Sequence, residues 1–532
     1  MSTIPKVTRA GDRRGAVWRG RRWRGPGARW RRGAAALAAG AVPALAFPAP
    51  SLWWLAYVAL VPLIVLVRSA PDGRRAAVDG WLGGAGFMLA VHHWLLPSLH
   101  VFLVVLAALL GLLWVPWGWL VWRLLGGSPG PGAVAAALPL VPSAWLMAEL
   151  VRSWQYLGGP WGLLGASQWQ VAPALRLASV GGVWLLSFLL VAVNTALAAL
   201  LTLARARTLA VGALALVVAA GAAVWLWVPA APRGATLRVA VVQPGLIDRP
   251  ADRFDRAVAL TRELAGQRLD LVVWGESSIG FDLAHHPRQG RQLVALSRLL
   301  HTDLLVNVDA QGDGERGIAK TAVLVGPDGP TGPEYAKMRL VPFGEYIPLR
   351  SALGWATAFG KAAGVDGRRG HHQVVMDVGA ARVGPLICFE SAFPDMSRHL
   401  ARMGAQVLVA QSSTSSFQDS WAPAQHASLA ALRAAETWRP TVHATLTGIS
   451  AVFDARGRPV GPRLGTRESA ARVYPVPLSA GSSPYVRLGD WVPPAAVALL
   501  LAGAAYEGVA AVRRRRPREA GAPRRRPAVR SR

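Results

Sequence analysis

Apolar runs of bilayer length alternate with short polar connectors over the first 230 residues of the chain. A membrane-spanning helix needs about 20 predominantly apolar residues, and eight runs approach this length. They cover residues 34–49, 52–68, 79–96, 100–124, 132–151, 177–203, 208–229 and 490–512. The pattern predicts a multi-pass α-helical membrane domain at 34–229 with seven spans, and an eighth span at 490–512.

The first run admits a second interpretation. Pro43, Pro48 and Pro50 shorten it, because proline interrupts a helix, and a short apolar run behind basic residues is typical of a signal peptide. However, the basic segment is longer than that of a signal peptide, and seven further apolar runs follow. We therefore interpret the run as a first span that turns back into the second.

The pattern changes between residues 235 and 484. Short β-rich runs alternate there with helical stretches, among them residues 424–438. The runs predicted as strands begin at Leu237, Leu269, Leu304, Ala322, Val383, Val407 and Ala451. Strands that alternate with helices over this length predict one α/β domain with a sheet core.

Composition supports a membrane protein and locates the charge. The chain is 52% hydrophobic and only 16% charged, and it contains 23 tryptophans, a balance rare in soluble proteins. Of its net charge of +29, 19 charges lie in the two tails, since the first 32 residues hold eleven basic residues against one acid and the last 20 hold ten against one. Basic tails beside apolar segments bind anionic headgroups, whereas a nucleic-acid site places its charge on a folded surface. We expect no nucleic-acid partner.

Basic residues in the short loops predict the orientation. Lys and Arg collect in cytoplasmic loops. The short loops 47–51 and 97–100 carry neither, whereas six loop arginines fall on the side of the basic N-terminus. They are Arg68, Arg74, Arg75, Arg123, Arg205 and Arg207. Both tails, 1–33 and 513–532, are therefore expected in the cytoplasm, and the α/β domain at 235–484 is expected on the extracytoplasmic face of the plasma membrane.

Three residue types at predicted strand ends suggest chemistry. Cys388, the only cysteine in 532 residues, ends an apolar run; Glu276 follows another, and Lys337 lies on a later loop. A lone cysteine excludes an intrachain disulfide. A thiol nucleophile needs a base, and the tetrahedral oxyanion needs a cation or N–H donors. Glu276 can be the base, and Lys337 and the backbone N–H of Phe389 can stabilise the oxyanion, so the set suits acyl transfer.

Each residue alone has a simpler explanation. Cys388 could be a small buried apolar residue, Glu276 and Lys337 a surface ion pair, and Glu345 an ordinary loop acid. Their joint occurrence favours a site. Neither a Walker motif nor a dinucleotide-binding glycine motif occurs in a usable context, and we expect no cofactor and no metal ion.

The motifs around these residues carry a resemblance to a known family. They are Trp-Gly-Glu-Ser at 274–277, Tyr-Ala-Lys-Met-Arg-Leu-Val-Pro-Phe-Gly-Glu-Tyr-Ile-Pro at 335–348 and Cys-Phe-Glu-Ser at 388–391. The motifs resemble the nitrilase superfamily. With its apolar runs, nearly the whole chain resembles the bacterial apolipoprotein N-acyltransferase family.

The resemblance implies a fold, a reaction and residue roles. The fold is a nitrilase-like α/β sandwich, and the reaction passes an acyl chain from a membrane phospholipid, through a thioester on Cys388, to the N-terminal amine of S-diacylglyceryl-cysteine in a lipoprotein. Glu276 is implied as the base and Lys337 as the oxyanion stabiliser. Glu345 and Glu390 are implied as supports that orient Lys337 and the site.

Two departures from the family pattern leave other functions open. Gly275 replaces the proline usual in nitrilases, and a serine-rich segment from Gln411 to Phe417 replaces Ser-Asn-Asp followed by an aromatic residue. One alternative function is a membrane-tethered carbon-nitrogen hydrolase (amidase). The other is a catalytically silent membrane scaffold for another envelope enzyme.

Overall fold

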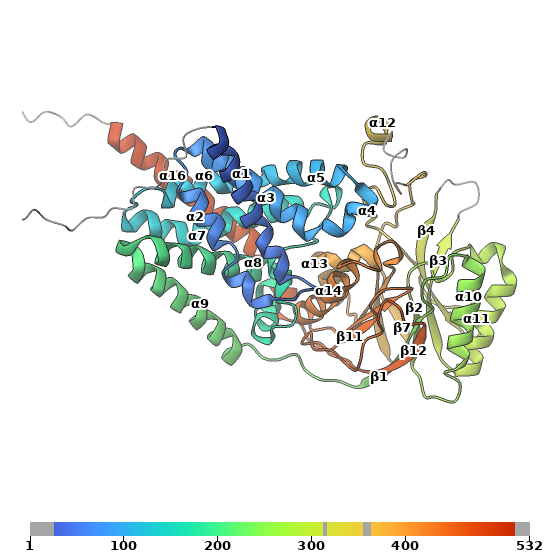
Figure 1. Cartoon of the computed structure of the whole chain (residues 1–532). Helices are drawn as coiled ribbons and strands as arrows, with labels where there is room; N and C mark the ends of the chain where they lie inside the picture. The colour runs from blue at the N-terminus through green and yellow to red at the C-terminus, as the bar shows by residue number, and fades with distance from the viewer. Residues whose placement is uncertain (1–25, 312–316, 355–362, 516–532) are drawn as a thin grey trace, which may run out of the picture.

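The structure is a computed structural model that describes residues 26–311, 317–354 and 363–515. Most of the two basic tails therefore lies outside the described residues. A helical region comes first and an α/β region follows, and the last long helix returns to pack against the helical region (Figure 1).

The helical region contains the apolar runs predicted as spans. Its helices are α1 (Pro26–Ala41), α2 (Val61–Arg68), α3 (Gly73–Val91), α4 (Leu96–Leu99), α5 (Phe102–Gly111), α6 (Val115–Leu125), α7 (Pro131–Arg152), α8 (Ala172–Thr202), α9 (Arg207–Trp227) and α16 (Val492–Arg515). Short 3₁₀ turns continue several of them. Gly182, with φ of 67°, breaks α8 internally, a conformation that glycine adopts without strain.

Five helical segments are long and apolar enough to cross a membrane, among the residues that the structure describes. They are Phe102–Leu125, Pro131–Arg152, Ala172–Thr202, Ala204–Trp227 and Val492–Val512. The first three predicted spans do not meet these criteria: α1 begins among arginines, the apolar stretch Trp53–Arg68 is shorter, and α3 carries two arginines and an aspartate. A region of several apolar helices is confirmed, and the number of crossings stays a prediction.

Small residues allow close packing between these helices. A Cβ atom added at Gly118 of α6 would lie 2.8 Å from the Cα of Gly80 in α3. Close approach of this kind is common where apolar helices associate without a hydrophobic driving force between them. Trp114, Trp117 and Trp145 are fully buried beside this contact and pack edge to face.

Two sheets form the centre of the α/β region. The strands are β1 (Thr236–Gln243), β2 (Leu271–Trp274), β3 (Asp303–Ala310), β4 (Ala319–Gly326), β5 (Gly329–Pro330), β6 (Tyr335–Ala336), β7 (Met376–Val378), β8 (Ala381–Ile387), β9 (Val407–Ser412), β10 (Thr441–Thr445), β11 (Ala451–Phe453) and β12 (Ala470–Pro477). One sheet has the order β12-β1-β2-β3-β4-β5, with β6 also paired to β4, and the other has the order β11-β10-β9-β8-β7. All seven predicted strands are present.

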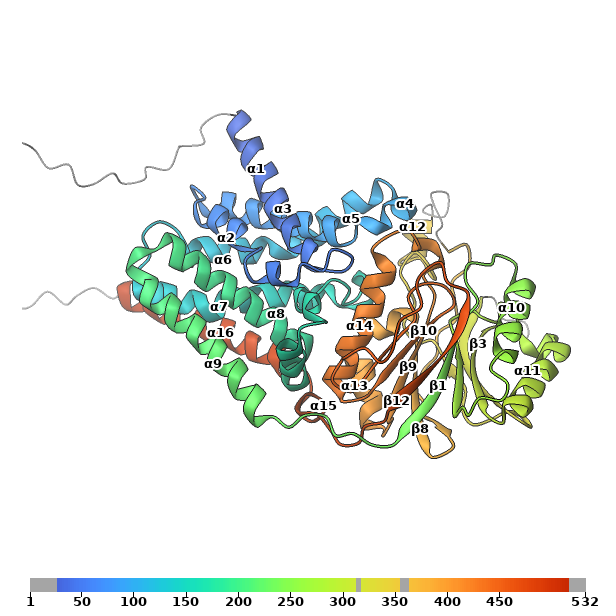
Figure 2. The same cartoon turned by 60° about the horizontal axis from the view of Figure 1, so that its bottom comes forward.

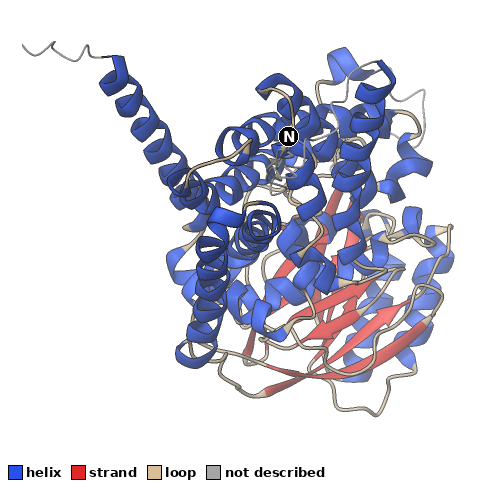
Figure 3. Ribbon diagram, turned by 60° about the vertical axis from the view of Figure 1, so that its left-hand side comes forward, coloured by secondary structure: helices blue, strands red, loops and turns tan. Residues whose placement is uncertain are grey.

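The sheets pack face to face and are covered by helices on both outer faces (Figures 2 and 3). Helices α10 (Pro250–Arg262) and α11 (Pro287–Leu300) cover the first sheet, and α13 (Pro394–Arg402) and α14 (Ala422–Thr437) cover the second. The shorter helices are α12 (Arg350–Leu353) and α15 (Pro484–Leu488). The predicted helix at 424–438 is α14, which lies between its sheet and the helical region and is almost entirely buried. The predicted α/β sandwich is therefore confirmed.

Candidate active site

The three predicted residues meet where parallel strands end. Glu276 follows β2, Cys388 follows β8, and Lys337 follows the short strand β6. The Nζ atom of Lys337 lies 2.9 Å from Oε1 of Glu276 and 2.8 Å from Oε1 of Glu345. Strands β2 and β8 belong to different sheets. Their carboxyl ends lie at the same end of the sandwich, because the N–H of Glu276 donates to the carbonyl of Ser412, the last residue of β9, and β9 is parallel to β8.

Cys388 occupies a strained turn between β8 and a 3₁₀ helix. Its φ is 53°, a left-handed conformation that costs a non-glycine residue on the order of 1 kcal/mol. The residue is half-buried, and its Sγ lies 3.8 Å from the carbonyl oxygen of Ser413. Burial raises the pKa of the Cys388 thiol, and the carboxylate of Glu276 raises it further. The resting thiol is therefore protonated and needs a base to become a nucleophile.

Glu276 is placed to act as that base. Its side chain is buried, and burial alone would raise its pKa, but the ammonium groups of Lys337 and Lys320 outweigh this effect and hold the pKa below its ordinary value. A hydrogen bond from the Cys388 thiol acts in the same direction. Glu276 is therefore ionised at neutral pH and lies beside the Cys388 thiol.

Lys337 is fully buried between two carboxylates. Burial would lower the pKa of its ammonium, but Glu276 and Glu345 raise that pKa well above the ordinary value. The backbone N–H of Lys337 donates to the carbonyl of Lys320 over 2.9 Å, and its own carbonyl accepts from Gly370. Lys337 is thus a fixed cation with a rigid backbone.

Glu345 and Glu390 hold the surrounding loops. Glu345 contacts Lys337 through Oε1 and accepts the N–H of Val341 through Oε2, over 2.8 Å. Glu390 is fully buried and does not contact Lys337; it accepts hydrogen bonds from both the loop after Lys337 and the turn before Cys388. Its donors are the hydroxyl of Tyr335 and the N–H groups of Met338, Arg339 and Ile387. One carboxylate therefore ties the lysine loop to the cysteine turn.

The helical region forms one wall of the site. The rings of Phe389 and Phe393 pack edge to face at 5.0 Å, and a Cβ atom added at Gly159, in the loop between α7 and α8, would lie 2.7 Å from each ring. In the same loop, the indole N–H of Trp161 donates to Oε1 of Gln425 over 2.8 Å. The loop therefore packs directly against the residue that follows Cys388.

The serine-rich segment serves the site through its backbone. The carbonyl of Ser412 accepts the N–H of Glu276 over 3.2 Å, and the carbonyl of Ser413 faces the thiol. The side-chain amide of Gln411 donates to the carbonyls of Trp274 and Leu305 and so bridges the two sheets. The departure from the family pattern therefore leaves the three central residues in contact.

Two side chains outside the predicted set also reach the site. Lys320 of β4 places Nζ 4.0 Å from Oε1 of Glu276, and His426 of α14 places Nε2 3.0 Å from the carbonyl oxygen of Cys388. Burial lowers the pKa of His426 to about 4, so its ring is neutral at pH 7. One sequence signal points to Lys320: the chain uses lysine only four times against 54 arginines, and two of the four lie here.

Comparisons with known proteins agree with the two-part architecture. The family described as the apolipoprotein N-acyltransferase N-terminal domain matches residues 39–196, and the carbon-nitrogen hydrolase family matches residues 238–474. A structural likeness to an amidase from Nesterenkonia sp. is weak, with a TM-score of 0.34, 21% identity and coverage of 47% of this chain and 93% of the amidase.

Relatives of known name match along almost the full length. The apolipoprotein N-acyltransferase of Azotobacter vinelandii is 33% identical over 92% of this chain and 96% of its own length. That of Geobacter metallireducens is 31% identical over 90% of this chain and 95% of its own length. The chain belongs to the apolipoprotein N-acyltransferase family.

Proposed function

We propose that the chain is an acyltransferase that moves an acyl chain from a membrane phospholipid to the N-terminal amine of S-diacylglyceryl-cysteine in lipoproteins. The observation that carries the proposal is the buried Glu276–Lys337–Glu345 network in contact with the chain's single thiol. Family membership supports the same reaction.

The first step makes a thioester. The carboxylate of Glu276 takes the proton of the Cys388 thiol as sulfur attacks the ester carbonyl carbon of the phospholipid. Lys337 and the N–H of Phe389 stabilise the tetrahedral oxyanion. The carbon–oxygen bond then breaks, the protonated Glu276 gives its proton to the leaving alkoxide, and a lysophospholipid departs.

The second step uses the same groups in the reverse sense. The lipoprotein amine attacks the thioester carbonyl, Glu276 takes a proton from the attacking nitrogen, and the carbon–sulfur bond breaks as the amide forms. Glu276 returns the proton to the thiolate. Glu345 and Glu390 support both steps by holding Lys337 and the cysteine turn in register.

Exclusion of water is needed between the two steps, because a thioester otherwise hydrolyses. Phe389, Phe393 and Gly159 close the wall of the site that faces the helical region. Both substrates are membrane lipids, so a site at the junction of an apolar helical region and an α/β region suits them.

The proposed topology places the α/β domain at 235–484 outside the cytoplasm, with eight spans and both termini inside a bacterial plasma membrane. The arginine distribution in the loops supports it. In Figure 1 the described ends of α1 and α16 lie on the side of the helical region away from the sandwich. Single cysteines in a Cys388→Ala background test it: an impermeant maleimide applied to intact cells is expected to label Arg233→Cys and not Ser128→Cys, and the reverse pattern would contradict the topology.

Mass spectrometry of the purified protein after incubation with phospholipid tests the reaction. An acyl adduct on Cys388 is expected in the wild type, released by a diacylglyceryl-cysteine peptide, and no adduct is expected in Glu276→Gln or Cys388→Ala. An amidase would leave Cys388 without an acyl group from phospholipid. A silent scaffold would retain its cellular function in Cys388→Ala.

A further inference from the structure

We infer that Lys320 is a second cationic positioning residue of the acyl-transfer site, which keeps Glu276 ionised and correctly oriented while Lys337 serves the oxyanion. The inference rests on the proposed function, because it takes Glu276 as the base. It adds a residue that none of the three motifs contains.

The position of Lys320 lets it contact both charged residues of the site. It is the second residue of β4, and in the antiparallel register it lies opposite Asp309 of β3. Its carbonyl accepts the N–H of Lys337 over 2.9 Å, while its side chain reaches toward the turn that carries Glu276. One residue thus fixes the backbone of the buried lysine and supplies charge to the carboxylate.

A hydrogen-bonded network orients the ammonium of Lys320. Its Nζ donates to Oγ of Ser277 and lies 3.4 Å from Oδ1 of Asp309. The hydroxyl of Ser277 in turn donates to Asp309 over 2.8 Å. Ser277 directly follows Glu276 and has φ of 52°, so it occupies a strained turn that needs such support.

The charge balance around Glu276 explains why a second cation is needed. Three carboxylates, those of Glu276, Glu345 and Asp309, face only two ammonium groups, those of Lys337 and Lys320. The other titratable groups that face Glu276 are the Cys388 thiol and the ring of His426, and both are neutral at pH 7. Without Lys320, Lys337 would be the only ammonium beside Glu276 and Glu345 among the described residues, because the other cation near Asp309 is the guanidinium of Arg253.

The division of work between the two lysines follows from their exposure. Lys337 is fully buried and held by two carboxylates, whereas the Lys320 side chain is 25% exposed. When an oxyanion forms, it competes with Glu276 for the hydrogen bonds of Lys337. Lys320 remains beside Glu276 at that moment, because its own partners are Ser277 and Asp309.

The single cysteine allows a direct test on the full-length protein in detergent. The rate of Cys388 alkylation by iodoacetamide, measured against pH, reports how readily Glu276 removes the thiol proton. An opposite charge within about 4–6 Å lowers the pKa of a carboxyl group by one to three. Lys320→Gln keeps a donor for Ser277 but removes the charge. The acidic limb of its pH profile, the range in which the alkylation rate rises with pH, is therefore expected to move up by about one pH unit.

Two further variants make the test sharp. Lys320→Arg keeps the charge and is expected to hold the limb near its wild-type position. Asp309→Asn keeps an acceptor for Ser277 but removes the opposing negative charge, so its limb is expected to move down. A limb that stays in place in Lys320→Gln, or moves up in Asp309→Asn, would overturn the inference.

Controls separate this inference from the proposed function. Arg298→Gln, which removes an exposed charge of α11, is expected to leave the limb unchanged. Glu276→Gln is expected to abolish the limb; if the limb persists there, the proposed base is wrong. If wild-type protein forms no acyl adduct with phospholipid, the proposed function fails while the role of Lys320 beside Glu276 is still decided by alkylation.

Discussion

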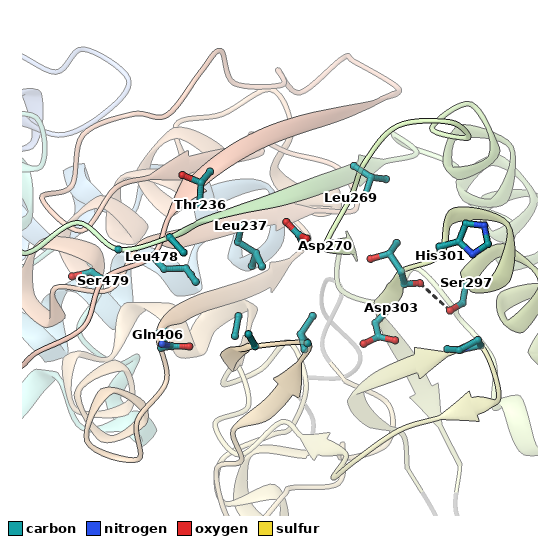
Figure 4. Close-up of a pocket in the computed structure, with 18 of the residues that line it drawn as sticks. Thr236, Leu237, Leu269, Asp270, Ser297, His301, Asp303, Gln406, Leu478 and Ser479 are labelled. Carbon is teal, nitrogen blue, oxygen red and sulfur yellow. Dashed lines mark hydrogen bonds between the residues drawn. The ribbon is translucent and has the colours of Figure 1, made fainter.

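The two ends of the α/β sandwich differ in how their charged side chains are paired. At the end next to the helical region, the carboxyl ends of β2 and β8 carry Glu276 and Cys388 in a closed ionic network. At the other end, the amino ends of the strands surround a cavity of about 830 Å³ (Figure 4). The cavity contains no comparable ionic network among the described residues.

One carboxylate at each end illustrates this difference in charge pairing. Burial acts on both Glu276 and Asp303, a cavity residue that begins β3. Two lysines reverse the effect at Glu276 and hold its pKa low, whereas no cation compensates Asp303, whose pKa burial raises. Shifted pKa values with specific charged partners mark candidate functional sites. In α/β folds the carboxyl ends of parallel strands are also the usual place for ligands.

Buried charged side chains of α14 also connect the helical region to the site. Oε1 of Glu436 in α14 accepts the N–H of Val183, directly after the break in α8, over 2.7 Å. Arg433, one helical turn earlier, pairs with Glu436 and donates to the carbonyl of Ala392 over 3.0 Å. Because Ala392 ends the 3₁₀ helix that begins at Cys388, buried charges connect the apolar helices to the catalytic turn.

The largest expected effect comes from removing the buried cation. Lys337→Met leaves Glu276 and Glu345 buried without their shared partner, which costs about 3–5 kcal/mol when a buried ion pair is broken. Loss of oxyanion stabilisation lowers acyl transfer by about a thousandfold. The rate of thioester formation on Cys388 is the measurement. Lys337→Arg keeps the charge but not the compact shape, so it is expected to remain impaired; full activity in either variant would contradict the assignment.

A smaller effect is expected from the neutral histidine beside Cys388. The pKa of His426 is about 4 in the folded protein because of burial, against about 6.5 in the unfolded chain. The unfolded chain therefore binds the proton first, so the stability that His426 contributes is complete above pH 6.5 and is lost as the pH falls to 4. The loss amounts to about 3 kcal/mol.

Thermal unfolding of wild type and His426→Gln in detergent tests this at pH 7 and pH 4. The wild type is expected to lose more stability on acidification than the variant, since glutamine does not titrate. Measuring the difference between the two proteins cancels most titrating groups that do not contact His426. An equal loss in both proteins would show that the pKa of His426 is the same in the folded and the unfolded chain.

The sequence was sufficient for features that depend on local pattern. Continuous apolar runs predicted the strands that contain Val241, Val273 and Leu386, because central strands buried on both faces consist of such runs. A carboxylate, an ammonium and a thiol, each at the end of a predicted strand, also predicted one site, because acyl transfer by a thiol needs all three.

Features that depend on tertiary context escaped prediction. Strand β10 has the sequence Thr-Val-His-Ala-Thr and is fully buried. Its polar residues interrupt the apolar pattern that would predict a strand, and pairing with neighbouring strands stabilises it. Strand β12 contains Pro475 and Pro477, which suit only a sheet edge. Lys320 reaches Glu276 only because β3 and β4 pair in one register, and no spacing along the chain contains that information.

The smallest effect is expected at the cavity end, and it tests the contrast most directly. Asp303→Asn removes a partly buried charge that no cation stabilises, so stability is expected to stay within about 0.5 kcal/mol of wild type. Thioester formation on Cys388 is expected to stay within about twofold, because none of the charged groups around Glu276 contacts Asp303. The matched change at the other end, Glu276→Gln, is also a carboxylate-to-amide substitution and is expected to abolish the reaction. A comparable loss in Asp303→Asn would mean that the cavity takes part in acyl transfer, and the end that carries the chemistry could then no longer be identified from charge alone.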